Sequence, residues 1–481
     1  MSALHYLYNR KVLIFVSLLL MATLASSCFG DAFNIISPFA SGASDKIVNN
    51  EVELRDAINN APTKKSFTIA LNNDITLTDS TLNIPSNKNI TLTSNKADGY
   101  YKLIGTTHEP SPFTVWENSV STITVNSDGV LVLDGIDITH TYNSLGYVIS
   151  VNKNGQFIMY RGLISSNIGG ICNNGVFLMY DGEISGNSVL NGGGVYNRGV
   201  FRMWGGKILG NSAGNSGGGV YNEATFEMFG GEISGNTAST GGGIYNWGGA
   251  IAIKFNFTRD TKEIAGYGDQ YDGGFTLSGG VISGNTAGRG GGVDNRGVFI
   301  MSCGVISDNT ATGSGGGVNN GDSIIVANFE MSGGEISGNT AFKGGGVYHF
   351  FHSIASIMGS SVISDNTAEW GGGVCIDDDF TMSGGVISDN TAQIGGGVYI
   401  GNGVFKLTGG KISGNTASSS KDVYVGNGVF EQIGGKISDN GVIYVCIIVV
   451  TVCIVTVCSG LYFKKMKKKD LSKITTNIES I

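Results

Sequence analysis

Residues 329–348 read FEMSGGEISGNTAFKGGGVY, and residues 380–399 read FTMSGGVISDNTAQIGGGVY. Both stretches contain a Phe-x-Met run, then an Ile-Ser-x-Asn run, then a Gly-Gly-Gly-Val-Tyr run. The same order recurs, with small changes, through most of the chain. Repetition at a fixed period is the sequence signature of a solenoid, in which each repeat packs on its neighbours. The repeat therefore predicts the fold.

Two apolar positions keep a fixed spacing within this repeat. The isoleucine of the Ile-Ser-x-Asn run recurs mostly every 24 or 25 residues between Ile164 and Ile437. Phe stands seven residues before it, except once, where Ser356 takes that place. The phenylalanines are Phe157, Phe177, Phe201, Phe226, Phe275, Phe299, Phe329, Phe380, Phe405 and Phe430. We expect like residues to stack inside a tube.

Each repeat holds three short runs with alternating apolar and polar residues, separated by Gly, Asn and Ser. Such runs at a fixed period predict a coil of three strands, each paired with its equivalent about 4.8 Å above and below. Asn fills the fourth place of the Ile-Ser-x-Asn run from Asn167 to Asn440. We expect this column to pass amide hydrogen bonds from coil to coil. The fold class is thus all-β, a parallel β-helix solenoid.

Composition supports this fold and excludes others. The 481 residues include 77 Gly, without the strict three-residue period of collagen. All 5 Pro precede residue 113, as expected if later residues form a continuous parallel sheet. The formal net charge is -8, and the body without its basic tail is more acidic still. An acidic body argues against a nucleic-acid partner, which needs a basic face.

The chain divides into segments. Residues 151–440 carry the regular repeats, and residues 46–150 keep a similar alternation in less regular form, which indicates irregular coils. Within the latter, 51–61 places Leu54, Ala57, Ile58 and Ala61 on one helical face before Pro62. We expect this helix to cap the open end of the tube, because an exposed strand edge invites pairing with other chains.

The two ends indicate export and anchoring. Residues 1–30 contain a short basic region, an apolar run and small residues, the pattern of a cleaved signal peptide. Residues 442–463 are uncharged and long enough to form one transmembrane helix, and the lysine-rich segment 464–481 follows directly. Positive charge stays on the cytoplasmic side, so the body is expected outside the cell, with the tail in the cytoplasm.

The repeats of 329–348 and 380–399 resemble those of adhesin-like surface proteins and of chlamydial polymorphic outer-membrane proteins. The chain as a whole resembles a right-handed parallel β-helix of the pectin-lyase-like superfamily, well over about 150–440 and loosely over 48–150. The resemblance implies a right-handed coil and display on a surface. For the enzymes of this fold, it implies acid/base or calcium-assisted cleavage of acidic polysaccharides.

Three insertions interrupt the repeat between its Val-Tyr run and its Phe-x-Met run. They separate Tyr245 from Phe275, Asn319 from Phe329, and Tyr348 from Ser356. Since all three fall in the same turn, we expect them to protrude from one edge, where solenoids often bind ligands. The candidate ligand-binding residues of this edge are Trp247, Tyr267, Asp269, Tyr271, His349, Phe350, Phe351 and His352. Exposed aromatic rings beside carboxylates suit sugar rings. Neutral drift of the loops is the alternative.

Metal and modification sites have weaker signals. Asp377, Asp378 and Asp379, one coil beyond His349, form a candidate metal site, and Asp365 with Asp389 form a candidate calcium stripe. The alternative for the latter pair is a row of solvated turn residues, because Asp alternates there with Gly. Asn89 and Asn256 begin Asn-x-Thr sequons, which are acceptors only where the host glycosylates proteins.

The sequence favours a membrane-anchored, adhesin-like surface protein with no catalytic residues, whose rigid rod presents a loop edge to a glycan or a protein. No cofactor is required, and calcium is the one metal considered. A surface-anchored polysaccharide lyase or glycoside hydrolase is the first alternative, and a purely structural coat protein is the second. Fold alone does not choose among them. A catalytic groove should disrupt consecutive repeats with charged residues, whereas most coils here match.

Overall fold

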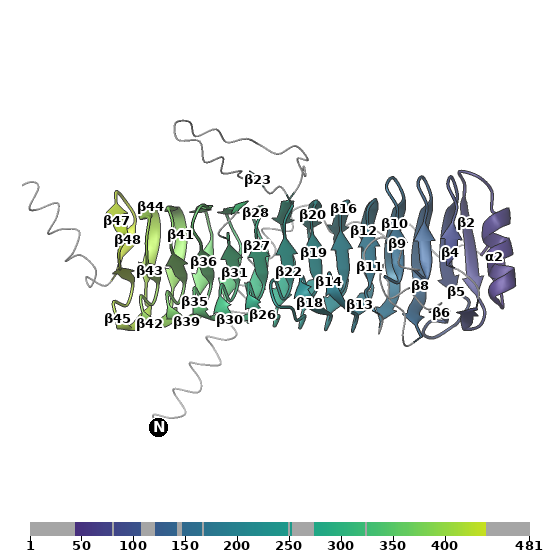
Figure 1. Cartoon of the computed structure of the whole chain (residues 1–481), viewed down its shortest axis with the longest axis horizontal. Helices are drawn as coiled ribbons and strands as arrows, with labels where there is room; N and C mark the ends of the chain where they lie inside the picture. Colours follow the sequence, from purple (N-terminus) through teal and green to yellow (C-terminus); the bar gives the residue numbers. More distant parts are fainter. Residues whose placement is uncertain are drawn as a thin grey trace, which may run out of the picture.

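The computed structural model describes residues 44–78, 81–106, 121–141, 147–165, 168–248, 251–252, 274–322 and 325–438. Over these residues the chain winds into a parallel β-solenoid, as the repeat predicts. Figure 1 shows a straight rod in which successive coils lie side by side in sequence order. The first described residues and helix α2 (Glu51–Asn60) lie at one end, and β47 and β48 lie at the other.

One sheet is built from the Val-Tyr runs, and each coil contributes one strand to it. Its 13 parallel strands are hydrogen-bonded in sequence order. They are β4 (Leu82–Ile84), β7 (Ile123–Val125), β9 (Ile149–Val151), β11 (Ile171–Asn173), β15 (Val195–Asn197), β19 (Val220–Asn222), β22 (Ile244–Asn246), β27 (Val293–Asn295), β31 (Val318–Asn320), β36 (Val347–His349), β40 (Val374–Ile376), β43 (Val398–Ile400) and β46 (Val423–Val425). We call it the Val-Tyr sheet.

A second sheet of 25 strands contains the Phe-x-Met runs and the isoleucine runs, which long strands join into one. Its strands are β1 (Lys46–Val48), β2 (Ser66–Leu71), β3 (Ile75–Leu77), β5 (Asn89–Ser94), β6 (Lys102–Gly105), β8 (Val130–His140), β10 (Gln156–Ser165), β12 (Val176–Met179), β13 (Glu183–Ser185), β16 (Val200–Met203), β17 (Lys207–Leu209), β20 (Thr225–Met228), β21 (Glu232–Ser234), β24 (Gly274–Leu277), β25 (Val281–Ser283), β28 (Val298–Met301), β29 (Val305–Ser307), β33 (Asn328–Met331), β34 (Glu335–Ser337), β37 (Ile354–Ile357), β38 (Val362–Ser364), β41 (Phe380–Ser388), β44 (Val404–Ser413), β47 (Val429–Gln432) and β48 (Lys436–Ile437).

The regular coils contain a fourth short strand that the sequence pattern did not predict. It follows the Ile-Ser-x-Asn run, where Thr points outward and Ala points inward, as Thr310 and Ala311 do. These strands are β14 (Ser188–Asn191) and β18 (Ser212–Ser216), then β26 (Thr286–Arg289), β30 (Thr310–Ser314), β35 (Thr340–Lys343), β39 (Thr367–Trp370), β42 (Thr391–Ile394) and β45 (Thr416–Ser419). We call the last six the Thr-Ala sheet. It lies next to the Val-Tyr sheet in each coil.

The interior of the rod is a set of apolar columns, as predicted. The phenylalanines from Phe157 to Phe329 are fully buried, and consecutive rings stack with centroids 4.5–5.0 Å apart. The sequence spacing assigned Ser356 to the next place, but the strand pairing puts Ala355 opposite both Phe329 and Phe380. The spacing failed there because one extra residue separates this column from Ile363. Burying each large apolar side chain contributes roughly 1.5–3 kcal/mol.

Two columns of buried asparagines run along the rod. In the predicted one, from Asn187 to Asn415, each side-chain amide donates to the carbonyl oxygen of the next asparagine at 2.9–3.1 Å. The column ends where Asn415 donates to the Asp422 carboxylate at 2.8 Å. Asn167 and Asn440 lie outside the described residues. Because every member is satisfied in a buried site, the column fixes the coil register.

The second asparagine column was not predicted. It occupies the last position of the Val-Tyr strands from Asn173 to Asn320, and the side chains are linked at 2.7–2.8 Å. These asparagines also donate to backbone carbonyls at the start of the Phe-x-Met strand in the next coil, as Asn295 does to Asn328. The Val-Tyr-Asn triplets at 195–197 and 220–222 and the Ile-Tyr-Asn triplet at 244–246 were the signal that could have revealed it.

The structure describes only part of what was predicted for the ends. Helix α2 buries Leu54, Ala57 and Ile58 in the core. Asn50 accepts a hydrogen bond from the Glu53 backbone at the start of this helix. The predicted signal peptide (1–30), transmembrane helix (442–463) and basic tail (464–481) lie outside the described residues. Among the described residues, no helix combines the length and apolarity needed to cross a membrane.

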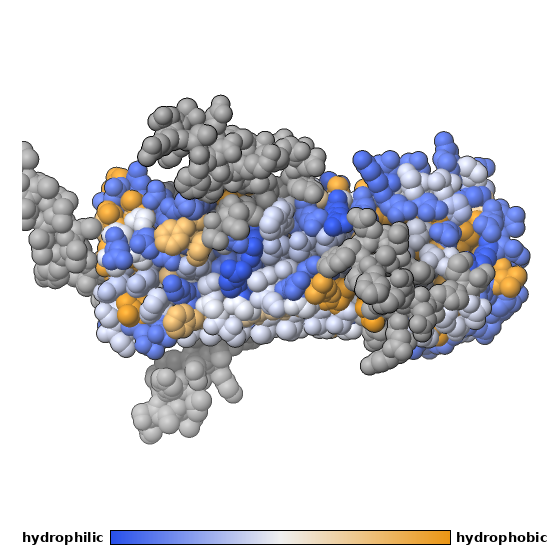
Figure 2. All heavy atoms as spheres, viewed as in Figure 1, coloured by the Kyte–Doolittle hydropathy of each residue, from blue (hydrophilic) through white to orange (hydrophobic). Residues whose placement is uncertain are grey.

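The outer surface of the rod carries no continuous apolar face on the side that Figure 2 shows, where orange residues occur in separate groups among blue and white ones. Some outward aromatic rings stack on one another instead. Tyr160, Tyr180, Trp204 and Phe229 form one such ladder, with centroids 4.8–5.5 Å apart. Since neighbouring rings cover each other's faces, such a ladder stabilises the coils rather than offering flat surfaces to a ligand.

Candidate binding site

The three insertions lie at one edge of the rod and contact each other. The first follows β22, the second follows β31 and the third follows β36, all in the Val-Tyr sheet. A strand of the first, β23 (Ile251–Ala252), pairs antiparallel with a strand of the second, β32 (Ile325–Val326). In the second insertion, Gly321 packs against Ser353 and Phe350 of the third. We call these segments the insertion edge.

The described candidates divide between the surface and the interior. Phe351 is 40% exposed and His352 is exposed, while Trp247 and Phe350 are half-buried. Trp247 stacks on Tyr245 with centroids 6.2 Å apart, and Phe350 meets Tyr348 edge-on at 5.8 Å. The remaining predicted residues of the first insertion, Tyr267, Asp269 and Tyr271, lie outside the described residues.

His349 was predicted to lie on the exposed edge, but it is completely buried inside the coil. It occupies the next place in the second asparagine column, since β36 pairs with β31. Its ring meets Phe380 edge-on at 5.7 Å. Burial lowers the pKa of His349 to about 4, against smaller opposite effects of Asp378 and the Asp379 carbonyl. Alternation along the strand turns this position inward, so His349 cannot contact a ligand at the surface.

The three consecutive aspartates bind the protein itself. Asp377 accepts a hydrogen bond from the Tyr348 hydroxyl at 2.7 Å, and Asp378 accepts one from the backbone of His352. Asp379 accepts one from the backbone of Val404 at 2.9 Å. These carboxylates therefore hold the third insertion and the next turn in place.

The candidate cation sites were compared with the groups of ligating side chains in the described part of the chain. No group of three or more His, Cys, Asp or Glu side chains there is arranged to hold a metal ion. Asp308, Asp365 and Asp389 take φ values of 56–59°, in the place where Gly has φ values of 61–73° in other coils. Asp tolerates this left-handed turn better than most residues, which explains its alternation with Gly.

The two sequons have different surroundings. Asn89 begins strand β5 and is half-buried, and its side-chain oxygen is buried without a hydrogen-bond partner among the described residues. Asn256 lies outside the described residues. Use of either sequon stays a prediction.

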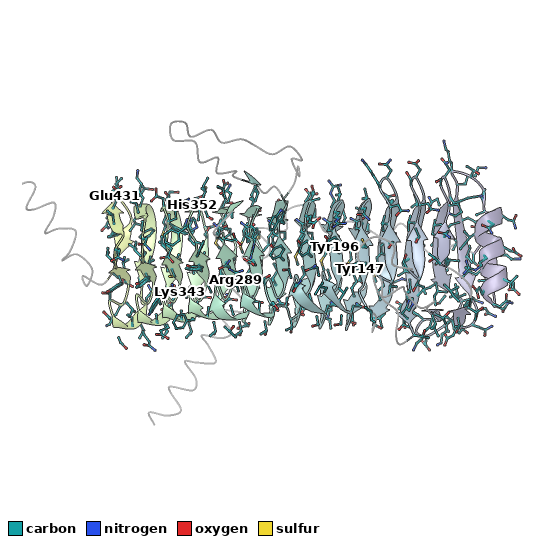
Figure 3. All side chains as sticks on the ribbon, in the orientation of Figure 1. Tyr147, Tyr196, Arg289, Lys343, His352 and Glu431 are labelled. Carbon is teal, nitrogen blue, oxygen red and sulfur yellow. The ribbon has the colours of Figure 1, made fainter. Side chains whose placement is uncertain are left out.

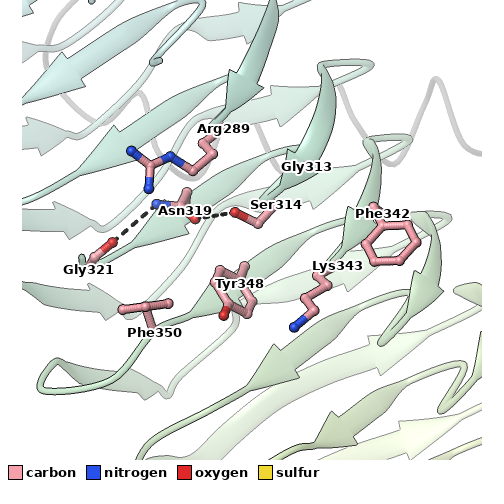
Figure 4. A pocket seen from close by; sticks show the side chains of 9 residues that line it. All are labelled: Arg289, Gly313, Ser314, Asn319, Gly321, Phe342, Lys343, Tyr348 and Phe350. Atoms are coloured by element: carbon pink, nitrogen blue, oxygen red, sulfur yellow. Dashed lines mark hydrogen bonds between the residues drawn. The ribbon is translucent and has the colours of Figure 1, made fainter. Parts of the chain in front are cut away.

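A pocket of about 220 Å³ opens at the base of the insertion edge, between the Thr-Ala sheet and the Val-Tyr sheet. Figure 4 shows the side chains around a common space, with Phe342 and Phe350 at opposite ends. The described lining residues are Arg289, Gly313, Ser314, Asn319, Gly321, Phe342, Lys343, Tyr348 and Phe350. Among these, Phe350 is the one described residue that the sequence analysis named as a candidate for ligand binding.

The pocket exists because a column of tyrosines is interrupted. The middle position of the Val-Tyr strands holds Tyr196, Tyr221 and Tyr245, whose rings stack 4.9 Å apart. In the next two strands the same position holds Asp294 and then Asn319, and Tyr348 follows in the third. Two shorter side chains thus leave space between Tyr245 and Tyr348.

Arg296 fills the first half of this gap. Its guanidinium lies over the Tyr245 ring, 5.2 Å from the centroid, and pairs with Asp294 and Asp322. Burial raises the pKa of Asp294, although the Arg296 charge and the hydrogen bond from Asn319 act in the opposite direction. Asn319 donates to Asp294 at 2.7 Å and accepts from Ser314 at 2.8 Å. The second half, beside Asn319, remains the open pocket.

Two cations reach this open half from the Thr-Ala sheet. Arg289, Ser314 and Lys343 occupy one register position on three consecutive strands. Figure 3 shows Arg289 and Lys343 on the same side of the rod. Within the described part of the chain, neither forms a salt bridge. The Lys343 ammonium lies 4.8 Å from the Trp370 ring centroid and 5.9 Å from that of Tyr348.

The sequence analysis assigned Arg289, two coils before His349 in the repeat, no role at the predicted edge. The structure instead puts it in the same pocket as Phe350. A distance of two coils along the rod is only about 10 Å, which long side chains cross. The change from Val-Tyr-Asn to Val-Asp-Asn and Val-Asn-Asn at 293–295 and 318–320 was the available signal.

The described residues that line the pocket offer aromatic surface and positive charge, and none of them is a carboxylate or a histidine. Burial and the hydrogen bond to Asp377 raise the pKa of Tyr348, which keeps its hydroxyl protonated.

Comparisons with family models, curated proteins and solved structures found no match.

Proposed function

We propose that this protein is a non-enzymatic, adhesin-like rod that binds a glycan or a protein at the insertion edge. The observation that carries the proposal is the pocket at the base of this edge, with its aromatic walls and two cations. A β-solenoid held by stacked columns is rigid, so a ligand binds without ordering the scaffold. Loops on a rigid scaffold are the usual place for recognition.

The proposal includes the setting inferred from the sequence. The coil is taken as right-handed, in the manner of pectin-lyase-like and adhesin-like proteins, and α2 as the cap of its first turn. Residues 1–30 direct export, and 442–463 anchor the rod with 464–481 in the cytoplasm. The rod then holds the insertion edge away from the cell surface.

The test compares two variants of the full-length chain in glycan-array and cell-binding assays. In the edge variant, Phe350→Ser with Phe351→Ser removes two aromatic rings from the third insertion. The control, Phe229→Ser, removes a partly exposed ring from the remote ladder. Far-ultraviolet circular dichroism checks that each variant is folded.

We expect the parent chain and the control to bind, and the edge variant to lose most of its binding. Equal binding by both variants, or no binding by the parent chain, contradicts the proposal. Release of reducing ends or unsaturated products from a polysaccharide would replace it with a surface-anchored lyase or hydrolase.

A further inference from the structure

We propose that the pocket beside Asn319 binds a six-membered ring that carries a carboxylate. This inference rests on the proposed binding function and names the ligand class of its site. Two observations carry it independently: the missing ring in the tyrosine column, and the pair of cations without a carboxylate partner among the described residues.

The interrupted column sets the shape of the ligand. Asn319 is directly opposite Tyr348 in the pairing of β31 with β36. Stacked tyrosines elsewhere in this column are 4.9 Å apart, so a ring in the vacant place would lie at stacking distance from Tyr348. The pocket volume of about 220 Å³ is below the usual range for drug-sized ligands, which limits the bound group to about one ring.

Two cations on the Thr-Ala sheet indicate that the ligand carries a negative charge. Arg289 and Lys343 are one strand to either side of Ser314, so two positive groups flank the pocket across about 10 Å of sheet. The chain as a whole has a net charge of -8, which makes two cations without a salt bridge among the described residues distinctive. A planar guanidinium binds a carboxylate through two parallel hydrogen bonds, which favours a carboxylate over a neutral group.

The two ends of the pocket supply apolar contact for the ring. Phe342 is 42% exposed at one end, and Phe350 is half-buried at the other. A bare inorganic anion would use the cations and leave these surfaces wet. A neutral ring would use the aromatic surfaces and leave Arg289 and Lys343 without an anionic partner among the described residues. A ring with an attached carboxylate uses both.

The ring can come from a sugar or from an aromatic acid, and the probes distinguish these sources. Calorimetry on the full-length chain compares glucuronate, glucose, benzoate and inorganic phosphate as ligands. We expect one of the two carboxylate rings to bind at least about 10-fold more tightly than both glucose and phosphate. The tighter of the two identifies the source.

Three variants locate the binding. Asn319→Tyr restores the column and fills the pocket, so it should abolish binding of the carboxylate ring. Arg289→Gln removes one cation from an exposed position and should weaken binding by about 10-fold or more. Lys411→Met, which replaces a lysine exposed on β44, is the matched control and should bind like the parent chain.

The outcomes separate this inference from the proposed function. Equal affinity for glucuronate, benzoate and glucose, or unchanged binding by Arg289→Gln, overturns the inference even if Asn319→Tyr does not fold. If the parent chain binds a carboxylate ring in the pocket but no glycan or cell surface, the ligand class stands and the proposed function fails. If cell binding survives Asn319→Tyr while ring binding is lost, the edge recognises its partner elsewhere.

Discussion

The side-chain amide of Asn320 donates a hydrogen bond to Nδ1 of His349 at 3.1 Å, and so joins a histidine to a column of asparagines. Asn320 cannot reverse this role, because its own oxygen accepts from Asn295 at 2.7 Å. On the other side of the ring, Nε2 lies 3.1 Å from the Asp379 carbonyl, which only accepts. The contacts therefore require a neutral His349 with its proton on Nε2.

Acid should weaken the rod through this histidine. The pKa of His349 is lowered by burial to about 4, whereas an unfolded chain keeps the ordinary value near 6.5. Between these pH values the unfolded state binds the extra proton and the folded state does not, so stability falls as pH decreases from 6.5 to 4. The loss should reach about 3 kcal/mol.

The variant His349→Asn isolates this effect. The introduced amide would accept from Asn320 as the other members of the column do, without a titrating group. Denaturant unfolding of the parent chain and of His349→Asn at pH 7 and pH 4.5 gives two pH differences, and the contributions of all other groups cancel. We expect the parent chain to lose about 2–3 kcal/mol more. Equal losses would show that His349 accepts a proton in the folded rod.

The first asparagine column should be sensitive to a single deletion in its middle. The amide of Asn309 donates to Asn339 and to the Ile282 carbonyl, and its oxygen accepts from Asn285. Asn309→Ala leaves buried groups on two neighbouring coils unsatisfied, at about 1–3 kcal/mol each. We expect a loss of roughly 2–5 kcal/mol in the free energy of unfolding, measured with guanidinium chloride.

Asn215→Ala provides the comparison for Asn309→Ala. Asn215 is exposed on β18 in a nearby coil, so its loss removes no buried hydrogen bond. Its free energy of unfolding should stay within about 0.5 kcal/mol of that of the parent chain. A similar effect of both substitutions would mean that the buried column adds nothing to stability.

The residues that repeat at fixed spacing were the ones whose environment the sequence predicted. Phe201 and Phe226 stack at 4.5 Å because the same coil geometry recurs at each step. Where a coil departs from the repeat, its strand pairing with the adjacent coils determines which residues are buried. The extra residue near Ala355 shifts the Phe column by one place. His349 is buried because it is the last residue of strand β36, at the position of the asparagine column, and is not part of the loop that follows the strand.

The pocket shows the same limit of sequence reasoning. One of its walls comes from the Thr-Ala sheet, which the three-strand interpretation did not contain, so Arg289 and Lys343 had no assigned face. The space between them is defined by a ring that Asn319 lacks. An absent side chain becomes visible only when the coils above and below are aligned in register. Trp247 and Phe350 lie half-buried at the insertion edge, but the sequence analysis missed the pocket itself.

A single phenylalanine in the interior should matter more than one in the outer ladder. Phe226 is fully buried between Phe201 at 4.5 Å and Phe275 at 5.0 Å. Phe226→Ala opens a cavity and should cost about 3–5 kcal/mol in thermal or denaturant unfolding. Phe229, three residues later, is 36% exposed, and Phe229→Ala should cost about 1 kcal/mol or less. Comparable costs at the two positions would contradict the assignment of the core to the Phe column.

Two substitutions of Asp365, which lies in a left-handed turn, can distinguish the effect of backbone strain on stability from the effect of losing the carboxylate. Asp365 is exposed with φ of 57°, and the equivalent residue of another coil, Gly338, has φ of 66°. Asp365→Ala removes the carboxylate and places a less tolerant residue in this conformation, so we expect a loss of about 1 kcal/mol. Asp365→Gly removes the same charge but adopts the turn freely, so its unfolding midpoint should lie above that of Asp365→Ala. If both variants instead lose equal stability, the carboxylate itself, rather than the turn geometry, is what the position requires, and a role in holding a cation would become the better explanation.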